Sequence, residues 1–386
     1  MAKQLKDGQP TSLVNWRERP HSQFSFHNVQ EYIRIEQIRQ ADAVRSLPHR
    51  VVSEGRFAEA VNTADFSEWL KELETDALII LKNGNIAFEW RAGHYQNDRP
   101  HIIFSVSKSI TGLLAGQLHA KGLIDPDRGV IEYLPEAAGS GYGGCTVQQL
   151  LDMQAAIEFD ESYLDKSGFY ARYRIASGWN PPSELFSGDE DLKSFLLSLN
   201  GTGQAHGKVF RYLSPNSDLL GIILENASGK RFADLVSEFI FAPFGCAHTA
   251  YVTVDKAGTA RSAGGICLHV HDLARIGLGI LEALRTSGHS GVPPLWLQDT
   301  VHSGNRAAWQ HGEFAKLLPQ GNYRNQWYIS GEPNDALIAI GIHGQWLYID
   351  PRNEVVIAKL SSQAEPVDEA LDIKLLEAFS QMAEAA

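Results

Sequence analysis

The sequence predicts an α+β fold, with an antiparallel sheet built from the N- and C-terminal segments, flanked by helices, beside a second, mainly helical lobe. Three observations predict it. Apolar runs typical of strands lie near both ends, at 77–90 and 326–360. About 230 residues between them show mostly the helical period. The length of 386 residues is enough for two to three lobes.

The N-terminal part supplies the first expected elements. Residues 1 to about 60 are polar and irregular, with a mixed-charge segment at 32–45 whose pattern is compatible with a helix. A short amphipathic helix is predicted at 66–73, because its apolar residues share one face. A hairpin follows, since Asn83-Gly84 lies between the apolar runs 77–81 and 86–90.

The C-terminal part repeats the strand character. We expect strands at 326–329, 337–342, 346–349 and 355–360, the last two joined by a turn at Asp350-Pro351-Arg352-Asn353, and a closing helix at 368–382. In the middle, Leu273, Ile276 and Ile280 lie on one helical face.

These elements predict three regions: an N-terminal extension packed on the core (1–65), an α/β lobe (66–135 with 300–386) and a mainly helical lobe (136–299). A cleft between two lobes is the natural place for a small ligand.

The composition excludes several function classes. With 34 Lys+Arg against 46 Asp+Glu the net charge is −12, and no basic block stands out, so nucleic-acid binding is not expected. The three cysteines cannot all pair within one chain, which favours a reducing compartment. We find no signal peptide and no apolar stretch long enough to span a membrane, and therefore predict a cytoplasmic protein that does not bind membranes.

The sharpest chemical signal is Phe104-Ser105-Val106-Ser107-Lys108-Ser109, which precedes an apolar helix. Ser105 and Lys108 are three residues apart and share one face if the helix begins near Ser105. The helix dipole there favours an oxyanion, and desolvation lowers the pKa of Lys108 so that it can accept the serine proton. This is the S-x-x-K arrangement of serine acyl-transfer enzymes. The tetrapeptide alone favours an N-capping serine with a solvated lysine, and its position before a buried-looking helix, with a matching element downstream, shifts the interpretation toward catalysis.

Two further segments lie downstream. Tyr212 precedes an apolar helix, where its hydroxyl can project into a cleft or its ring can anchor the helix start. The segment 340–345, Ile-Gly-Ile-His-Gly-Gln, places glycines in a strand, which marks either close approach of a ligand or a β-bulge.

Together and in this order, the three elements resemble the serine β-lactamase and DD-peptidase superfamily in its class C-like branch, which also holds carboxylesterases. The resemblance covers about residues 70 to 365 and is closest to the 6-aminohexanoate-dimer hydrolases. The segments that resemble these enzymes are 105–109, Ile124-Asp125-Pro126, Leu151-Asp152-Met153-Gln154, Asp272-Leu273-Ala274-Arg275 and 341–345.

The resemblance implies a role for each matching residue. Ser105 matches the nucleophile, Lys108 the lysine that activates it, and Tyr212 the tyrosine that passes a proton to the leaving group. The backbone N–H groups of Ser105 and Ile342 match the oxyanion hole. Tyr163 matches a tyrosine that closes over the substrate in the dimer hydrolases.

Departures from the family pattern bear on the substrate. Ser214 stands where β-lactamases carry the asparagine of Tyr-x-Asn, and 339–341 replaces their Lys-Thr-Gly motif, so efficient β-lactamase or DD-peptidase activity is not expected. Arg174 occupies the position of an acidic residue, and Ala263 that of an asparagine, in efficient nylon-dimer hydrolases. A cation at 174 repels an ammonium end, which favours a neutral or negatively charged substrate.

Other motifs carry no prediction of a cofactor or metal. The run 139–144 fits G-x-G-x-x-G but follows no strand. His269-Val270-His271-Asp272 lacks the further ligands of a metallo-hydrolase motif, and Asp272 fits a helix cap. His343 borders the expected cleft, where a structural hydrogen bond and a catalytic role both stay open.

We therefore predict a serine hydrolase that cleaves an amide or ester of a small molecule through an acyl-enzyme, similar to 6-aminohexanoate-dimer hydrolase with carboxylesterase activity. The alternatives are a short-chain carboxylesterase without dimer hydrolysis, a weak β-lactamase or DD-peptidase, and a non-catalytic acyl-binding protein. The resemblance also suggests a homodimer.

Overall fold

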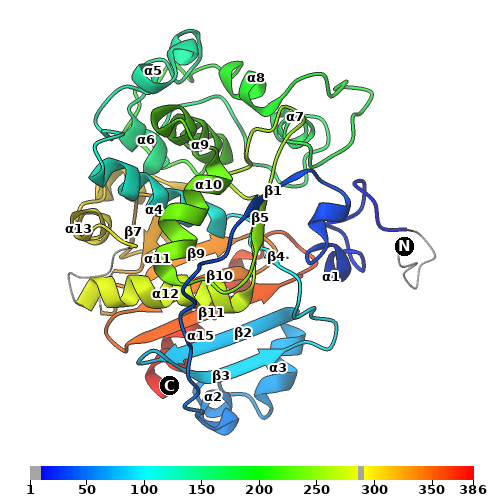
Figure 1. Cartoon of the computed structure of the whole chain (residues 1–386), viewed down its shortest axis with the longest axis vertical. Helices are drawn as coiled ribbons and strands as arrows, with labels where there is room; N and C mark the ends of the chain where they lie inside the picture. The colour runs from blue at the N-terminus through cyan, green and yellow to red at the C-terminus, as the bar shows by residue number, and fades with distance from the viewer. Residues whose placement is uncertain (1–9, 286–290, 332) are drawn as a thin grey trace.

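The computed structural model describes residues 10–285, 291–331 and 333–386, and it contains two antiparallel sheets with helices packed around them (Figure 1). The fold is of mixed α and β type, as predicted.

The larger sheet joins the two ends of the chain, because β2 near the N-terminus pairs with β11 near the C-terminus. Its seven strands run in the order β3-β2-β11-β10-β9-β8-β7, and every pair is antiparallel. Their bounds are β2 Thr75–Lys82, β3 Asn85–Arg91, β7 Asn322–Arg324, β8 Trp327–Ile329, β9 Leu337–Gly341, β10 Gln345–Asp350 and β11 Val355–Ser361. This confirms the predicted sheet built from both terminal segments.

Both faces of this sheet are buried, which explains why its strands read as continuous apolar runs. On β2, Leu78 and Ile80 enter one hydrophobic core, whereas Ile79 and Leu81 enter another. Helices α2 (Glu54–Ala60), α3 (Phe66–Glu72) and α15 (Glu369–Ala385) contribute to the first core, and α12 (Val270–Arg285) to the second. Figure 1 shows α12 lying across the sheet. The apolar face predicted from Leu273 onward is the face that α12 buries.

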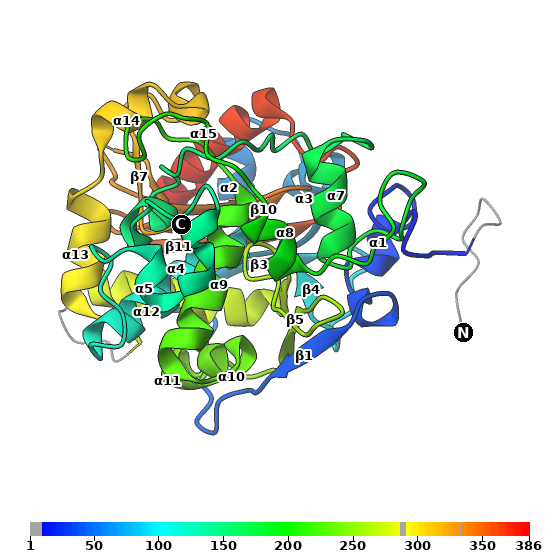
Figure 2. The same cartoon turned by 90° about the horizontal axis from the view of Figure 1, so that it is seen from above.

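The helical part lies on the α12 side of the sheet, around the long helix α9 (Figures 1 and 2). The α-helices not named above are α1 Ser22–Ser25, α4 Val106–Ala120, α5 Val130–Tyr133, α6 Val147–Leu151, α7 Phe169–Ala176, α8 Leu192–Leu197, α9 Ser214–Ser228, α10 Phe232–Val236, α11 Ala242–Phe244, α13 Pro294–His302 and α14 Arg306–Gln310. The 3₁₀ turns are η1 Val29–Glu31, η2 Pro135–Gly139 and η4 Glu313–Lys316, and η3 Ser237–Phe241 is a π-helical turn.

A second, four-stranded sheet has no counterpart in the prediction. Its order is β1-β5-β6-β4, from β1 Ile35–Ile38, β4 His101–Ile102, β5 Ala250–Thr253 and β6 Ile266–Leu268. The possible helix at 32–45 is wrong, because β1 pairs with β5 over this stretch. Strands of two to four residues are too short to show a period, and their partners are distant in sequence.

The N-terminal segment packs directly onto the centre of the molecule. The rings of Trp16 and Phe26 are fully buried and contact Phe104, and the Trp16 indole donates to the backbone oxygen of Trp179. The predicted boundaries at 65, 135 and 299 stay a prediction. In the part of the chain that the structure describes, no helix is both long and apolar enough to span a bilayer.

Candidate active site

Helix α4 brings Ser105 and Lys108 together. Ser105 is its N-cap residue, and Lys108, one turn later, is only 1% exposed. The Lys108 Nζ lies 2.8 Å from Ser105 Oγ, 3.0 Å from Ser214 Oγ and 2.8 Å from the Ala263 carbonyl oxygen. Three acceptors around one ammonium group fix its position. The sequence alternative of a solvated lysine is therefore wrong.

The backbone immediately before Ser105 is strained. Phe104 has φ of 42°, a conformation that costs a residue with a side chain about 1 kcal/mol or more. Its buried ring is held by Trp16, Phe26, Trp179 and His343. The aromatic packing thus fixes the turn that presents Ser105 to the adjoining pocket.

The electrostatics around Lys108 suit a base. Burial lowers the pKa of its ammonium group to about 7, although the nearby carboxylate of Glu161 acts to raise it. A lysine with such a pKa is neutral in a large fraction of molecules near neutral pH, and only the neutral amine can accept the proton of Ser105.

Glu161 reaches the lysine through Ser214. The Ser214 backbone N–H donates to Glu161 Oε2 at 2.9 Å, and its hydroxyl donates to Oε1 at 2.5 Å while accepting from Lys108. Burial raises the pKa of Glu161, and Lys108 opposes that shift. Ser214 therefore connects the buried amine of Lys108 with the buried carboxyl group of Glu161.

Tyr212 lies on the other side of the serine. Its hydroxyl hydrogen-bonds Ser105, and the Lys108 ammonium lies 4.9 Å from the centre of its ring. Its backbone N–H donates to Glu313 at 2.7 Å, which fixes the loop before α9. Burial raises the pKa of the phenol, so Tyr212 stays protonated and can donate a proton.

The end of β9 lies close to the backbone of Ser105. A Cβ at Gly341 would lie 2.6 Å from the Ile103 carbonyl oxygen and 3.1 Å from the Ser105 nitrogen, so only glycine fits without displacement. Among the residues that the structure describes, the N–H groups of Ser105 and Ile342 have no hydrogen-bond acceptor. Two free donors beside the nucleophile are the arrangement that binds an oxyanion.

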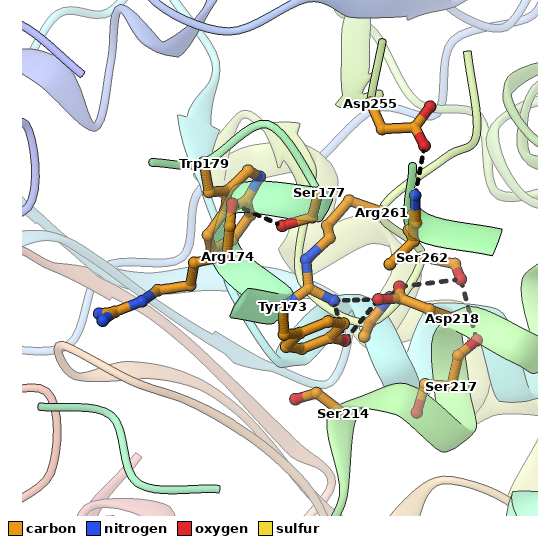
Figure 3. A network of polar contacts seen from close by, with 12 residues as sticks. Tyr173, Arg174, Ser177, Trp179, Ser214, Ser217, Asp218, Asp255, Arg261 and Ser262 are labelled. Carbon is orange, nitrogen blue, oxygen red and sulfur yellow. Dashed lines mark hydrogen bonds and ion pairs between the residues drawn. The ribbon is translucent and has the colours of Figure 1, made fainter. Parts of the chain in front are cut away.

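A buried network that includes Asp218, Arg261 and Tyr173 (Figure 3) holds the backbone of Ala263, whose carbonyl oxygen accepts from Lys108. The Ala263 N–H donates to Asp218 Oδ1 at 2.7 Å, and the other oxygen of Asp218 accepts from Arg261 and from the Tyr173 hydroxyl. Asp218 and Arg261 are almost fully buried as an ion pair. Ala263 thus acts through its backbone, and the structure gives no contact of its methyl group with a substrate cavity.

Two adjoining cavities lead to Ser105. The inner one, of about 50 Å³, is lined by Ser105, Tyr163 and Tyr212 together with the aromatic and apolar residues Phe314, Leu317, Tyr328 and Val367. The outer one, of about 600 Å³, shares Tyr163, Ile342 and Pro366 with it. Tyr163 therefore lies where the family tyrosine was expected, between the serine and the wider cavity.

The outer cavity has a cationic lining. Arg17, Arg19, Lys166 and Arg174 border it, against the two carboxylates of Glu18 and Glu365. Arg17 is stacked over Trp16 and Trp179, and burial, aided by Arg174, lowers its pKa to about 9. The excess of positive groups favours neutral or anionic ligands.

Arg174 and His343 both have structural partners. Arg174 donates to the backbone oxygens of Tyr163 and Asp165, so it braces the loop that carries Tyr163, and its side chain points away from the Asp218 network (Figure 3). His343 Nδ1 lies 2.7 Å from the Gln363 carbonyl oxygen, and burial lowers its pKa to about 4. A neutral, buried imidazole in this position supports the structural alternative for His343.

Two acidic residues near Ser105 were not identified from the sequence. Glu161 lies in a loop without a recognisable motif, and Asp372 lines the inner cavity from α15. Burial, followed by the neighbouring Asp368, raises the pKa of Asp372 to about 7, while Lys359 opposes the shift. Only the tertiary fold shows that either carboxyl group is close to Ser105.

Comparison with known proteins shows the family of the chain. Residues 66–380 match the family model Beta-lactamase. The chain is 35% identical to the 6-aminohexanoate-dimer hydrolase of Paenarthrobacter ureafaciens over 93% of its own length and 90% of that protein.

Solved structures share the fold. A protein from Bacillus anthracis that is assigned as a 6-aminohexanoate-dimer hydrolase is 24% identical, with a TM-score of 0.86 over 99% of this chain and 98% of that one. A family VIII carboxylesterase is 13% identical, with a TM-score of 0.59 over 86% and 99% of the two chains. The chain belongs to the Beta-lactamase family and is a serine hydrolase.

Proposed function

We propose that the protein hydrolyses an ester or amide bond of a small molecule through an acyl-enzyme on Ser105, as an enzyme of the S-x-x-K type. The observation that carries the proposal is the buried Lys108 Nζ at 2.8 Å from Ser105 Oγ. A lysine with a pKa of about 7 in this position can take the serine proton without a histidine.

In acylation, Ser105 Oγ attacks the substrate carbonyl carbon while its proton moves to the neutral Lys108 amine. The carbonyl oxygen becomes an oxyanion, which the N–H groups of Ser105 and Ile342 stabilise. The tetrahedral intermediate then collapses, and the bond to the leaving group breaks. Tyr212 donates its proton to the leaving group and recovers one from the Lys108 ammonium, so the proton balance closes.

Glu161 stabilises the ammonium form of Lys108 that acylation creates. The connection runs through the Ser214 hydroxyl, with hydrogen bonds of 3.0 and 2.5 Å. Since the group of residues is buried, an uncompensated ammonium there would be costly. A water molecule then attacks the acyl-enzyme and loses a proton to the same Lys108 and Tyr212 groups. The bond between the acyl group and Ser105 breaks, Ser105 Oγ regains a proton, and the acid is released.

The substrate has a neutral or anionic group in the outer cavity. Arg17 and Arg174 line that cavity, and the inner cavity offers an aromatic wall for an apolar acyl or leaving group. The second candidate is hydrolysis of the linear 6-aminohexanoate dimer, which the 35% identical relative favours. Its ammonium end would have to avoid the cationic lining.

The test compares initial rates on a short-chain aryl ester and on the linear 6-aminohexanoate dimer, for wild type and Ser105→Ala. Ester turnover that is lost in Ser105→Ala supports the proposal. Turnover of the linear 6-aminohexanoate dimer by wild type supports the second candidate, dimer hydrolysis. Hydrolysis of both substrates by Ser105→Ala at the wild-type rate would refute the acyl-enzyme on Ser105.

We also propose a cytoplasmic location and a homodimer. All three cysteine side chains are buried and unpaired, in keeping with a reducing compartment. The homodimer rests on the family resemblance alone, and sedimentation velocity of the purified protein tests it.

A further inference from the structure

A cluster of potential metal ligands lies apart from both cavities of the site. His27, Asp76 and His101 are each fully buried, and one ligand atom from each lies within 4.8 Å of the other two. They come from three different parts of the fold: His27 from the N-terminal segment after α1, Asp76 from β2 and His101 from β4. None of the three lines the inner or the outer cavity.

Among the residues that the structure describes, none makes a hydrogen bond to the His27 ring. Both of its ring nitrogens are buried without a hydrogen bond, although its ring touches those of Tyr95 and His101 edge-on. A neutral imidazole has one donor and one acceptor nitrogen, and burying either without a hydrogen bond destabilises the folded chain. Such a side chain beside a carboxylate and a second histidine points to a missing partner.

The hydrogen bonds of His101 define which of its nitrogens is free. Its Nδ1 lies 2.6 Å from the Ile102 carbonyl oxygen, which can only accept, so Nδ1 carries the hydrogen. In the neutral ring Nε2 is then an acceptor, yet it lies 3.0 Å from Oδ2 of Asp76, another acceptor. Either a second proton on His101 or a bound cation is needed to make this contact favourable. A second proton on His101 would satisfy that pair but would leave both nitrogens of His27 unpaired.

A metal ion satisfies all three residues together. Imidazole nitrogens and a carboxylate oxygen are ligands that Zn²⁺ prefers, at about 2.0 to 2.2 Å in a tetrahedral site. Ligand atoms of such a site are about 3.3 Å apart. The His101 Nε2 and Asp76 Oδ2 atoms are already 3.0 Å apart, and the three ligand atoms all lie within 4.8 Å of one another, so the His27 side chain would move closer to the other two on binding. The Nδ1 bond of His101 to a carbonyl is the outer contact typical of metal-bound histidines.

The carboxylate of Asp76 has two further partners. His94, one-third exposed, places Nε2 2.6 Å from Oδ1 of Asp76 and lies on the solvent side of the cluster. The hydroxyl of Ser362 donates to the same carboxylate oxygen at 2.9 Å and orients it.

We propose that His27, Asp76 and His101 form a zinc site with a structural role. The ion would tie the N-terminal segment to both sheets, because Asp76 is in the larger sheet and His101 in the smaller one. The neighbouring Phe26 contacts Phe104, which precedes Ser105, so the site would also brace the turn that presents the serine. The ligands are spread over 75 residues without a motif, which is why the sequence predicted no metal.

The test measures metal binding by the full-length chain, freed of any tag and stripped with EDTA. Zn²⁺ is added, and bound metal is counted by elemental analysis after gel filtration, with the melting temperature recorded with and without zinc. His27→Phe removes a ligand but fills the same space. His248→Phe is the matched control, since His248 belongs to a second histidine group with His269 and His271.

We expect one zinc per chain in wild type and in His248→Phe, none in His27→Phe, and a zinc-dependent rise in melting temperature only where zinc binds. Co²⁺ in the wild type should show the visible absorption of tetrahedral histidine ligation. Metal-free His27→Phe should melt no lower than metal-free wild type, because it removes an unpaired buried group.

Wild type without bound zinc, or His27→Phe that keeps one zinc per chain, would overturn the proposal. If His248→Phe lost zinc while His27→Phe kept it, zinc would bind at the other histidine group, and the proposal would also be overturned. Since the readouts are metal content and melting temperature, the result does not depend on the proposed hydrolase reaction.

Discussion

Replacing Glu161 by glutamine tests how the site prepares its base. The substitution keeps the shape and an oxygen that can accept from Ser214, but it removes the negative charge beside Lys108. The Glu161 carboxylate raises the pKa of Lys108, against the larger effect of burial, so its loss must lower that pKa below about 7. Because the base works as the neutral amine, the acidic limb of the pH–rate profile should move to lower pH.

The magnitude follows from the two hydrogen bonds through Ser214, of 3.0 and 2.5 Å. Two unit charges about 5 Å apart in an effective dielectric of about 20 interact by about 3 kcal/mol. With about 1.4 kcal/mol per pKa unit, the upper limit is about 2 pH units. Burial raises the pKa of Glu161 and so reduces its ionised fraction, which makes a shift between about 1 and 2 pH units the expected result.

The assay is kcat/KM for a neutral aryl ester between pH 5 and 9, which reports groups of the free enzyme. Glu365→Gln is the control, because Glu365 lines the outer cavity and does not act on the pKa of Lys108. Its midpoint should match that of wild type, near pH 7. A midpoint for Glu161→Gln that stays in place or rises would refute the reasoning.

Three further predictions follow from the geometry. Gly341→Ala would place a Cβ 2.6 Å from the Ile103 oxygen and 3.1 Å from the Ser105 nitrogen. The kcat for ester hydrolysis should therefore fall by about 10²-fold, with KM little changed. An unchanged kcat would contradict the proposed oxyanion hole. Arg174→Gln should raise the ratio of kcat/KM for an ammonium-ended ester to kcat/KM for a carboxylate-ended ester by about tenfold. An unchanged ratio would show that Arg174 does not select the substrate by its charge. Trp16→Ala should cost about 3 to 5 kcal/mol in urea unfolding, whereas a loss below about 1 kcal/mol would show that the N-terminal segment contributes little.

The larger sheet could be predicted because several of its strands are long and end at recognisable turn sequences. The Asn83-Gly84 turn and the continuous apolar runs of β2 and β11 show in the sequence, and burial on both faces explains their composition. The smaller sheet could not. Its strand β4 has two residues, and β1 owes its conformation to pairing with β5, more than 200 residues away.

The same division applies to the site. Ser105 and Lys108 lie in one turn of helix, so their spacing allows the contact that the structure shows, and the downstream segments of the family pattern favoured it over a solvated lysine. Tyr212 was identified from its position in the family pattern, and the structure places it beside Ser105. The catalytic roles of Ser105, Lys108 and Tyr212 stay proposals. Glu161 could not be found from the sequence, because its bond to Ser214 depends on how a loop folds over α9.

The most direct test of the central claim is the mass of the protein during turnover. An aryl ester that deacylates slowly is mixed with wild type, quenched in acid within seconds and analysed as intact protein and as peptides. The account predicts a mass increase of one acyl group on the peptide that contains Ser105, absent in Ser105→Ala. Turnover without any acylated protein, or an acyl group on another residue that persists in Ser105→Ala, would contradict it.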